Sequence, residues 1–140
     1  MAKEYIKIFV AADVIMERDY RYLLVQEKKE SAYGLWGIPG GRVETGETIE
    51  ETAAREVKEE TGYSVRLVGE VGIFHADGDD QVRHIFAGEI GDGDLVFPPE
   101  EILDARWFSL EEIEKMSAEL RGPWVLEALK KYEENFKNFA

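Results

Sequence analysis

The sequence contains no cysteine, only four prolines, and no apolar run near the roughly 18 residues that a membrane-spanning helix needs. The lack of cysteine excludes disulfides, thiol chemistry and cysteine-ligated zinc. Basic residues are also scarce, because 17 Lys and Arg stand against 30 Asp and Glu, for a formal net charge of −13. That charge disfavours binding to a nucleic-acid duplex or to an anionic membrane, since both repel a polyanion.

The remaining composition is that of one globular domain. The 140 residues are 44% hydrophobic and 11% aromatic, which suffices for one sizeable core. No repeat or linker divides the chain, so we expect a single domain over residues 1–140 with a C-terminal helix at about 123–136 packed on it. The first residues lack the pattern of a secretory signal, and we expect a cytoplasmic protein.

Hydrophobic periodicity predicts alternating strands and helices. Thr48 to Glu51 and Ser109 to Glu112 each have the spacing of a helix capping box, and Gly62 is a typical helix stop. Pro123 suits the start of the last helix. The predicted strands are 6–16, 20–26, 35–39, 64–76, 81–90 and 105–108, and the predicted helices are 48–61, 109–116 and 123–136.

The central predicted helix carries a cluster of acidic side chains. Glu56, Glu59 and Glu60 fall within one turn, and like charges at these spacings repel. Arg55 can pair with Glu59 at i+4, which leaves an excess of negative charge. Such a helix face either meets bulk water or holds a cation, and oxygen ligands of this kind suit Mg²⁺ or Mn²⁺ rather than zinc.

The wider pattern around this cluster resembles a known motif. Gly41, Glu47 and the run from Arg55 to Tyr63 resemble the Nudix box, G-x5-E-x7-R-E-U-x-E-E-x-G-U, where U is a bulky apolar residue. All seven fixed positions match, and Tyr63 stands at a position that is usually aliphatic. The resemblance implies an α/β fold, the Nudix α/β/α sandwich, with a mixed, partly antiparallel sheet between helices.

The resemblance also implies roles for the box residues. Glu56, Glu59 and Glu60 would bind Mg²⁺, with Mn²⁺ able to substitute, and the Gly40 carbonyl would be a further ligand. Glu56, Glu59 and Arg55 are the candidate catalytic residues, and Glu56 would act on the attacking water. Glu47 and Arg55 would orient the carboxylates.

Family members often recruit one more acidic residue from a late loop. Glu101 is the first choice here because it lies six residues before Trp107, with Glu100 and then Glu89 behind it. For Glu101, a solvated loop carboxylate is the alternative interpretation.

Substrate-binding candidates come from aromatic and basic residues near the expected site. Trp36, Phe74 and Phe86 could stack on a base, and core packing is the favoured interpretation for any one of them. Arg42 could meet phosphate. Further cationic candidates are Lys28, Lys29 and Arg83. The two histidines, His75 and His84, are not expected to form a metal pair.

The resemblance implies a Mg²⁺-dependent enzyme that hydrolyses a pyrophosphate bond in a nucleoside diphosphate linked to another moiety. Subgroup markers are missing: no proline lies between Pro39 and Pro98, and no tyrosine between Tyr63 and Tyr132. Elimination leaves a MutT-like hydrolase of (deoxy)nucleoside triphosphates. The alternatives are an ADP-ribose, nucleotide-sugar or dinucleoside polyphosphate pyrophosphatase, and a non-catalytic nucleotide-binding module. The partner of this protein would be a small-molecule nucleotide. We expect the protein to be a monomer or a homodimer.

Overall fold

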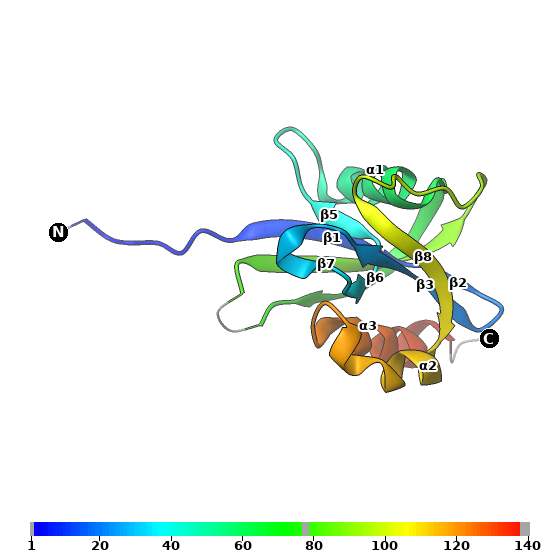
Figure 1. The fold of residues 1–140 in the computed structure, drawn as a ribbon. Helices are drawn as coiled ribbons and strands as arrows, with labels where there is room; N and C mark the ends of the chain where they lie inside the picture. Colours follow the sequence, from blue (N-terminus) through cyan, green and yellow to red (C-terminus); the bar gives the residue numbers. More distant parts are fainter. Residues whose placement is uncertain (1, 77–78, 138–140) are drawn as a thin grey trace.

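The computed structural model describes residues 2–76 and 79–137, and its regular elements alternate between strands and helices as the sequence predicts (Figure 1). The strands are β1 (Phe9–Ile15), β2 (Glu17–Arg18), β3 (Arg21–Glu27), β4 (Trp36–Gly37), β5 (Gly40–Arg42), β6 (Val65–Phe74), β7 (Gln81–Ile90) and β8 (Ile102–Ser109). The α-helices are α1 (Ile49–Thr61), α2 (Leu110–Lys115) and α3 (Trp124–Tyr132). Short 3₁₀ turns lie at Glu30–Ala32 and Ser117–Glu119, and a π turn at Glu133–Lys137.

The strands form two four-stranded sheets. In the first, with the order β5-β1-β7-β6, β1 and β7 are parallel and the other neighbours are antiparallel. In the second, β3 pairs antiparallel with β2, β4 and β8. The expectation of a mixed, partly antiparallel sheet is confirmed, with the refinement that the strands divide between two sheets.

Helices cover both sides of these strands (Figure 1). The α1 helix packs on β1 and β5, whereas α3 packs on β6 and contacts α2 on the opposite side. This is the α/β/α arrangement expected from the sequence. It places the C-terminal half of α1, the acidic end that carries Glu56, Glu59 and Glu60, beside β5, which contains Gly40 and Gly41.

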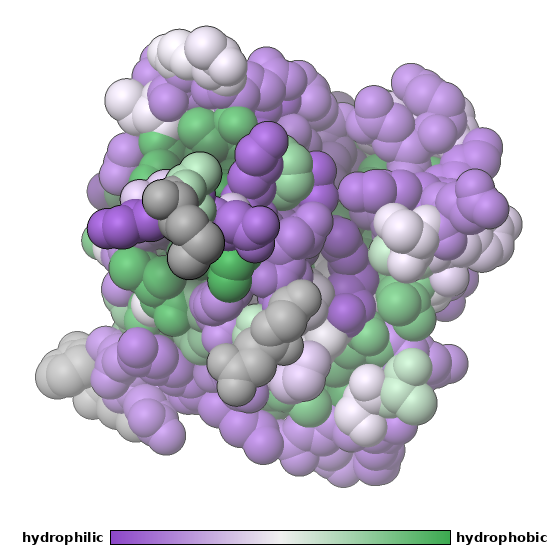
Figure 2. Space-filling view, turned by 90° about the vertical axis from the view of Figure 1, so that its left-hand side faces the viewer, coloured by the Kyte–Doolittle hydropathy of each residue, from purple (hydrophilic) through white to green (hydrophobic). Residues whose placement is uncertain are grey.

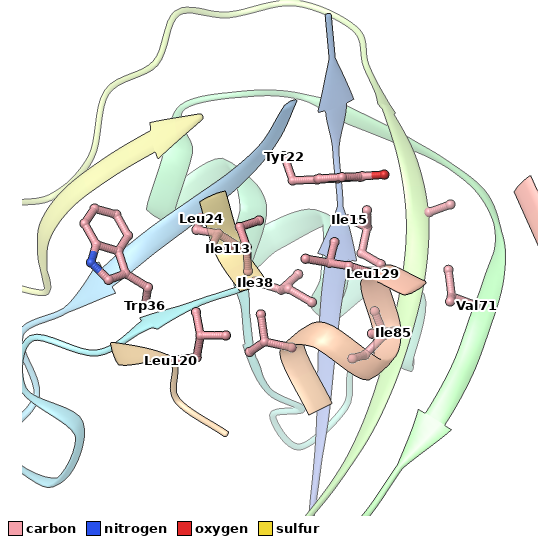
Figure 3. Packing of buried hydrophobic residues seen from close by; sticks show 13 residues of the cluster. Ile15, Tyr22, Leu24, Trp36, Ile38, Val71, Ile85, Ile113, Leu120 and Leu129 are labelled. Atoms are coloured by element: carbon pink, nitrogen blue, oxygen red, sulfur yellow. The ribbon is translucent and has the colours of Figure 1, made fainter. Parts of the chain in front are cut away.

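Two hydrophobic cores separate the layers. Ala53 and Val57 of α1 are fully buried in the core beneath that helix. In the other core, Leu129 of α3 points toward Ile15 and Ile85 of the first sheet (Figure 3). Each core thus joins one helical layer to the strands, which holds α1 rigidly against β5.

Both predicted capping boxes are present. The Thr48 and Ser109 side chains each accept a hydrogen bond from the N–H three residues later, and the glutamate there caps in return. Gly62 ends α1 in the left-handed conformation, with φ 80°. The last helix differs from the prediction: α3 begins at Trp124 and ends at Tyr132, after which the chain continues as a π turn rather than to residue 136 as an α-helix.

Two strands begin three residues away from their predicted starts. β8 begins at Ile102 rather than 105 because it pairs along the length of β3, as far as Glu27. β1 begins at Phe9, and Ile6, which the sequence places in this strand, is 85% exposed in the segment before it.

The surface agrees with the acidic composition. Hydrophilic residues cover most of the face in Figure 2, with hydrophobic residues in patches between them. In the described ranges, no helix combines the length and hydropathy needed to cross a membrane.

Candidate active site

A pocket of about 520 Å³ lies where the acidic end of α1 meets β5, the end of β3 and the loop before β8. That volume is within the range of small-molecule sites, roughly 300–1,000 Å³. Acidic and basic side chains line it together. The acidic residues are Glu27, Glu56, Glu60, Glu100 and Glu101, and the basic residues are Lys28, Lys29, Arg42, Arg83 and Arg121.

Glu60 is the most deeply buried of the box glutamates, with 6% of its surface exposed. Its Oε1 accepts a hydrogen bond of 2.9 Å from the Gly40 N–H. Burial raises the pKa of Glu60 well above its usual range. The Gly40 N–H opposes that rise, and the nearby Glu56 and Asp13 carboxylates add to it. A carboxylate in such surroundings lacks a balancing positive charge.

Arg55 connects the other box carboxylates. Its Nε and Nη2 donate to the two oxygens of Glu47 at 2.6 and 3.0 Å. Its Nη1 donates to Glu56 at 3.0 Å and to Glu59 at 3.2 Å. The bidentate pair with Glu47 holds the guanidinium in one orientation, so its remaining edge faces the helix. These contacts raise the pKa of Arg55 and lower that of Glu47 to about 2.

Glu56 reaches the pocket because the backbone opposite it has no side chain. A Cβ added to Gly41 would lie 2.5 Å from the Glu56 carboxyl carbon. Burial raises the pKa of Glu56, the charge of Arg55 lowers it, and the charges of Glu59 and Glu101 raise it again. The second glycine of the pair is therefore required for close approach of the carboxylate.

The loop before β8 brings Glu101 to the same pocket. The Glu101 carbonyl accepts from the Lys28 N–H at 3.2 Å, and Lys28 Nζ donates to the Pro99 carbonyl at 3.0 Å. Glu100 lines the pocket as well. Glu89, the third choice from the sequence, instead pairs with Arg66 at 2.5 Å on β6 and does not line the pocket.

The predicted metal ligands are only partly gathered. Glu56 and Glu60 line the pocket, whereas Glu59 is half-exposed and turned to Arg55. Across residues 2–76 and 79–137, no group of three or more His, Asp or Glu side chains is arranged to hold a metal ion. The donor chemistry nevertheless fits a hard divalent cation, because the Glu60 carboxylate is buried and the negative charges of Glu56, Asp13 and Glu27 act on it.

The aromatic candidates are placed differently from one another. Trp36 is 8% exposed and packs edge-on against Phe108, with ring centroids 5.0 Å apart. Phe86 is 5% exposed in the core beneath α1. Neither lines the pocket, so core packing accounts for both. Phe74 lies along an adjoining groove, and Arg42 lines the pocket itself while its guanidinium lies 4.0 Å from the Phe9 ring.

Sequence reasoning missed three charged residues near the site. Asp13 lies fully buried in β1 and pairs in register with Gly40, and its carboxylate binds Arg83 at 3.0 Å. Glu27 and Arg121 line the pocket and approach each other at 3.8 Å. A charged residue inside the apolar run of β1 was a signal for Asp13. Nothing local in the sequence marked the other two.

Comparison with known proteins agrees with the family resemblance and with the fold. A family model described as NUDIX domain matches residues 7–128. A Caenorhabditis elegans relative whose name places it among nudix hydrolases is 43% identical over 118 residues, covering 81% of this chain and 32% of that protein. The matching part therefore spans about a third of that relative's length.

Two further matches cover more of the compared proteins. A Methanocaldococcus jannaschii protein named ADP-ribose pyrophosphatase is 32% identical over 122 residues, covering 81% of this chain and 69% of the relative. A structure named as a NUDIX hydrolase from Nitrosomonas europaea superposes with a TM-score of 0.83 at 32% identity, covering 91% and 90% of the two chains. The names of these proteins support the expectation of an enzyme. The family match, the fold and the complete box together show that the chain belongs to the Nudix hydrolase family.

Proposed function

We propose that the protein is a divalent-cation-dependent hydrolase that cleaves a pyrophosphate bond in a nucleoside diphosphate linked to another moiety. One observation carries this proposal: a single pocket is lined by the box carboxylates Glu56 and Glu60 together with a group of cationic side chains. Carboxylates bind a polyanionic diphosphate only through a bridging cation, and the cationic side chains bind phosphate oxygens directly.

The chain's own residues divide the work as follows. Glu56 and Glu60, with Glu101, Glu59 and the Gly40 carbonyl, would hold Mg²⁺ or Mn²⁺. The bound cation supplies charge neutralisation of the phosphates and acidification of a water molecule. Glu56 accepts the proton of the attacking water, and its pKa, raised by burial, suits it to that task better than an exposed carboxylate.

Arg55 and Glu47 act as positioning residues. The bidentate pair holds the guanidinium so that Nη1 reaches Glu56 and Glu59. Arg55 thereby limits the positions that Glu56 can adopt.

The substrate we propose is a (deoxy)nucleoside triphosphate, as in MutT-like enzymes, with Mg²⁺ as the cation and a cytoplasmic location. The similarity to an ADP-ribose pyrophosphatase supports ADP-ribose as the second candidate substrate. The completeness of the box argues against a non-catalytic binding module.

A substrate panel tests the proposal. Nucleoside triphosphates, ADP-ribose, nucleotide sugars and dinucleoside polyphosphates are incubated with and without Mg²⁺, and the products are identified by chromatography. We expect cation-dependent release of a nucleoside monophosphate from at least one member. Tight nucleotide binding in calorimetry with no turnover over hours would instead support the binding module.

A further inference from the structure

The chain before β1 projects from the molecule and carries exposed apolar side chains. This N-terminal arm (residues 2–8) belongs to no strand, and no hydrogen bond joins it to the rest of the described chain. It leaves the body along the direction of β1 (Figure 1). Tyr5 and Ile6 are 81% and 85% exposed, and Ile8 is exposed as well. Single exposed apolar residues are ordinary, but several together mark a surface that binds another molecule.

A second apolar surface lies at the base of the arm, on the face of the first sheet that α1 partly covers. Ala12 of β1 is buried in the core beneath α1, whereas Val10, two residues earlier on the same face, is exposed. Val82 of β7 pairs in register with Val10. His84 pairs with Ala12 on one side and with Ile73 of β6, which is 59% exposed, on the other. The part of this face that α1 leaves uncovered, formed by Val10, Ile73, Val82 and His84, is named the open face.

The arm has one apolar side that matches this surface. Because side chains alternate in an extended chain, Ile6 and Ile8 share one side of the arm, and Tyr5 and Lys7 share the other. Fully extended, residues 2–8 span about 23 Å. That length exceeds the roughly 10 Å across three neighbouring strands. An arm can therefore cross the open face with its isoleucines against the sheet and its lysine in solvent.

Charge favours the same contact. The arm carries Lys3 and Lys7 and a single acidic residue, in a chain whose formal net charge is −13. Glu70 of β6 lies on the side of the open face, because it pairs in register with Phe86 of the core beneath α1. Its Oε1 is 3.1 Å from Nδ1 of His84. A cationic arm is attracted to this acidic border, whereas two copies of the chain repel each other elsewhere.

The arm of the same chain is directed away from the open face. It runs straight into β1, so it could cover Ile73 only after a sharp reversal. Residues 2–8 contain neither glycine nor proline, the residues that most favour tight turns. The arm that fits the open face is therefore that of a second copy.

We propose that two copies of this chain form a dimer in which the arm of each copy lies across the open face of the other. Ile6 and Ile8 of each arm pack against Val10 and Ile73 of the other copy. Because the exchange is reciprocal, a two-fold axis closes the assembly and leaves neither arm exposed. The contact lies outside the pocket of the box glutamates, so its test is independent of the proposed hydrolysis.

Sedimentation of the full chain over a wide range of protein concentration tests the proposal. We expect a dimer whose Kd rises about 100-fold or more in Ile6→Asp and in Ile73→Asp, because each substitution removes a buried isoleucine from both halves of the contact. Val96→Asp is the matched control, since it makes the same charge change at an exposed apolar residue of the loop before β8 and should leave the Kd unchanged. A monomer at every concentration would overturn the proposal, as would a dimer with the same Kd in all three variants.

Cross-linking locates the contact, and the absence of cysteine from the chain makes it specific. Ile6→Cys protomers are mixed with Ile73→Cys protomers and treated with a short bismaleimide, and the linked peptides are identified by mass spectrometry. We expect linkage between positions 6 and 73, and little between positions 6 and 96 when Val96→Cys protomers replace the Ile73→Cys protomers. Equal linkage in the two mixtures would show that the arm does not lie on the open face. The melting temperature of each variant is measured alongside, and the Ile6 variants, which alter only the arm, decide the question if an Ile73 variant is unstable.

Discussion

Glu47 lies eight residues before Arg55, yet both of its carboxylate oxygens bind the one guanidinium, through Nε at 2.6 Å and Nη2 at 3.0 Å. This pairing leaves Nη1 for the helix, where it reaches Glu56 and Glu59. The segment before α1 and the helix itself are thereby joined through one side chain. The spacing between Glu47 and Arg55 thus serves to orient a helix carboxylate.

Arg55→Lys tests this relationship. A lysine keeps the charge but supplies a single ammonium, which cannot bind Glu47 through two parallel bonds and also reach Glu56. We expect kcat on the best substrate to fall by about 10- to 100-fold, as is usual when a residue that orients metal ligands is lost. Arg66→Lys, at the exposed pair with Glu89, is the matched control and should retain activity. Wild-type kcat in Arg55→Lys would contradict the positioning role.

Glu60→Gln separates activity from stability. Gln has the same shape and can still accept a hydrogen bond from the Gly40 N–H. The substitution removes a carboxyl group whose pKa is raised by burial. We expect turnover to fall by about 100-fold or more, while the melting temperature holds or rises because no charge need be buried. Glu50→Gln, on the exposed first turn of α1, controls for loss of one charge. A decrease in both activity and melting temperature would show that Glu60 is mainly structural.

Gly41→Ala tests the close approach of Glu56. The new Cβ would lie 2.5 Å from the Glu56 carboxyl carbon, and the flexible carboxylate rather than the backbone would move. We expect activity to fall about tenfold or more, with little change in melting temperature. Gly91→Ala is the matched control, since its Cβ would meet only the Ser64 carbonyl at 3.5 Å. If both variants retain wild-type activity, the position of Glu56 is not critical.

Local signals predicted most of the fold. The capping boxes at Thr48 and Ser109 allowed the helix starts to be predicted, because the hydrogen bonds of a capping box lie within four consecutive residues. The long strands followed from apolar patterning, and β7 begins and ends where it was predicted, at Gln81 and Ile90. The division into two sheets could not be predicted, because it depends on pairing between β3 and β8, which are distant in sequence.

The site was predictable where its residues lie in the box, and in part outside it, since Glu101 and Arg83 were also named as candidates and line the pocket. Glu56, Glu60 and Arg55 could be named because the run from Arg55 to Tyr63 resembles the Nudix box, and their spacing on one helix brings them close together. Arg121 could not be, since its place in the pocket depends on the bridge between Trp36 and Leu120 that follows α2. The role of aromatic residues such as Phe86 could not be predicted, because a position on a β-strand does not show whether the side chain packs in a core or lines a pocket.

The pH dependence of stability gives a final test, at Glu47. Its hydrogen bonds with Arg55 and with the Glu44 N–H lower the folded-state pKa to about 2, from its usual value of 4.5. Because the folded-state pKa is the lower one, the stabilisation is fully present above about pH 4.5 and is lost as the pH falls toward about 2. Protonated Glu47 then resembles glutamine. The melting temperature of wild type should exceed that of Glu47→Gln near neutral pH, and the difference should shrink as the pH falls from about 5 to about 3. Glu50→Gln, measured over the same range, should differ little from wild type throughout. A difference that stays constant across this range would mean that the Glu47 charge does not stabilise the fold, and that shape and hydrogen bonding alone hold Arg55.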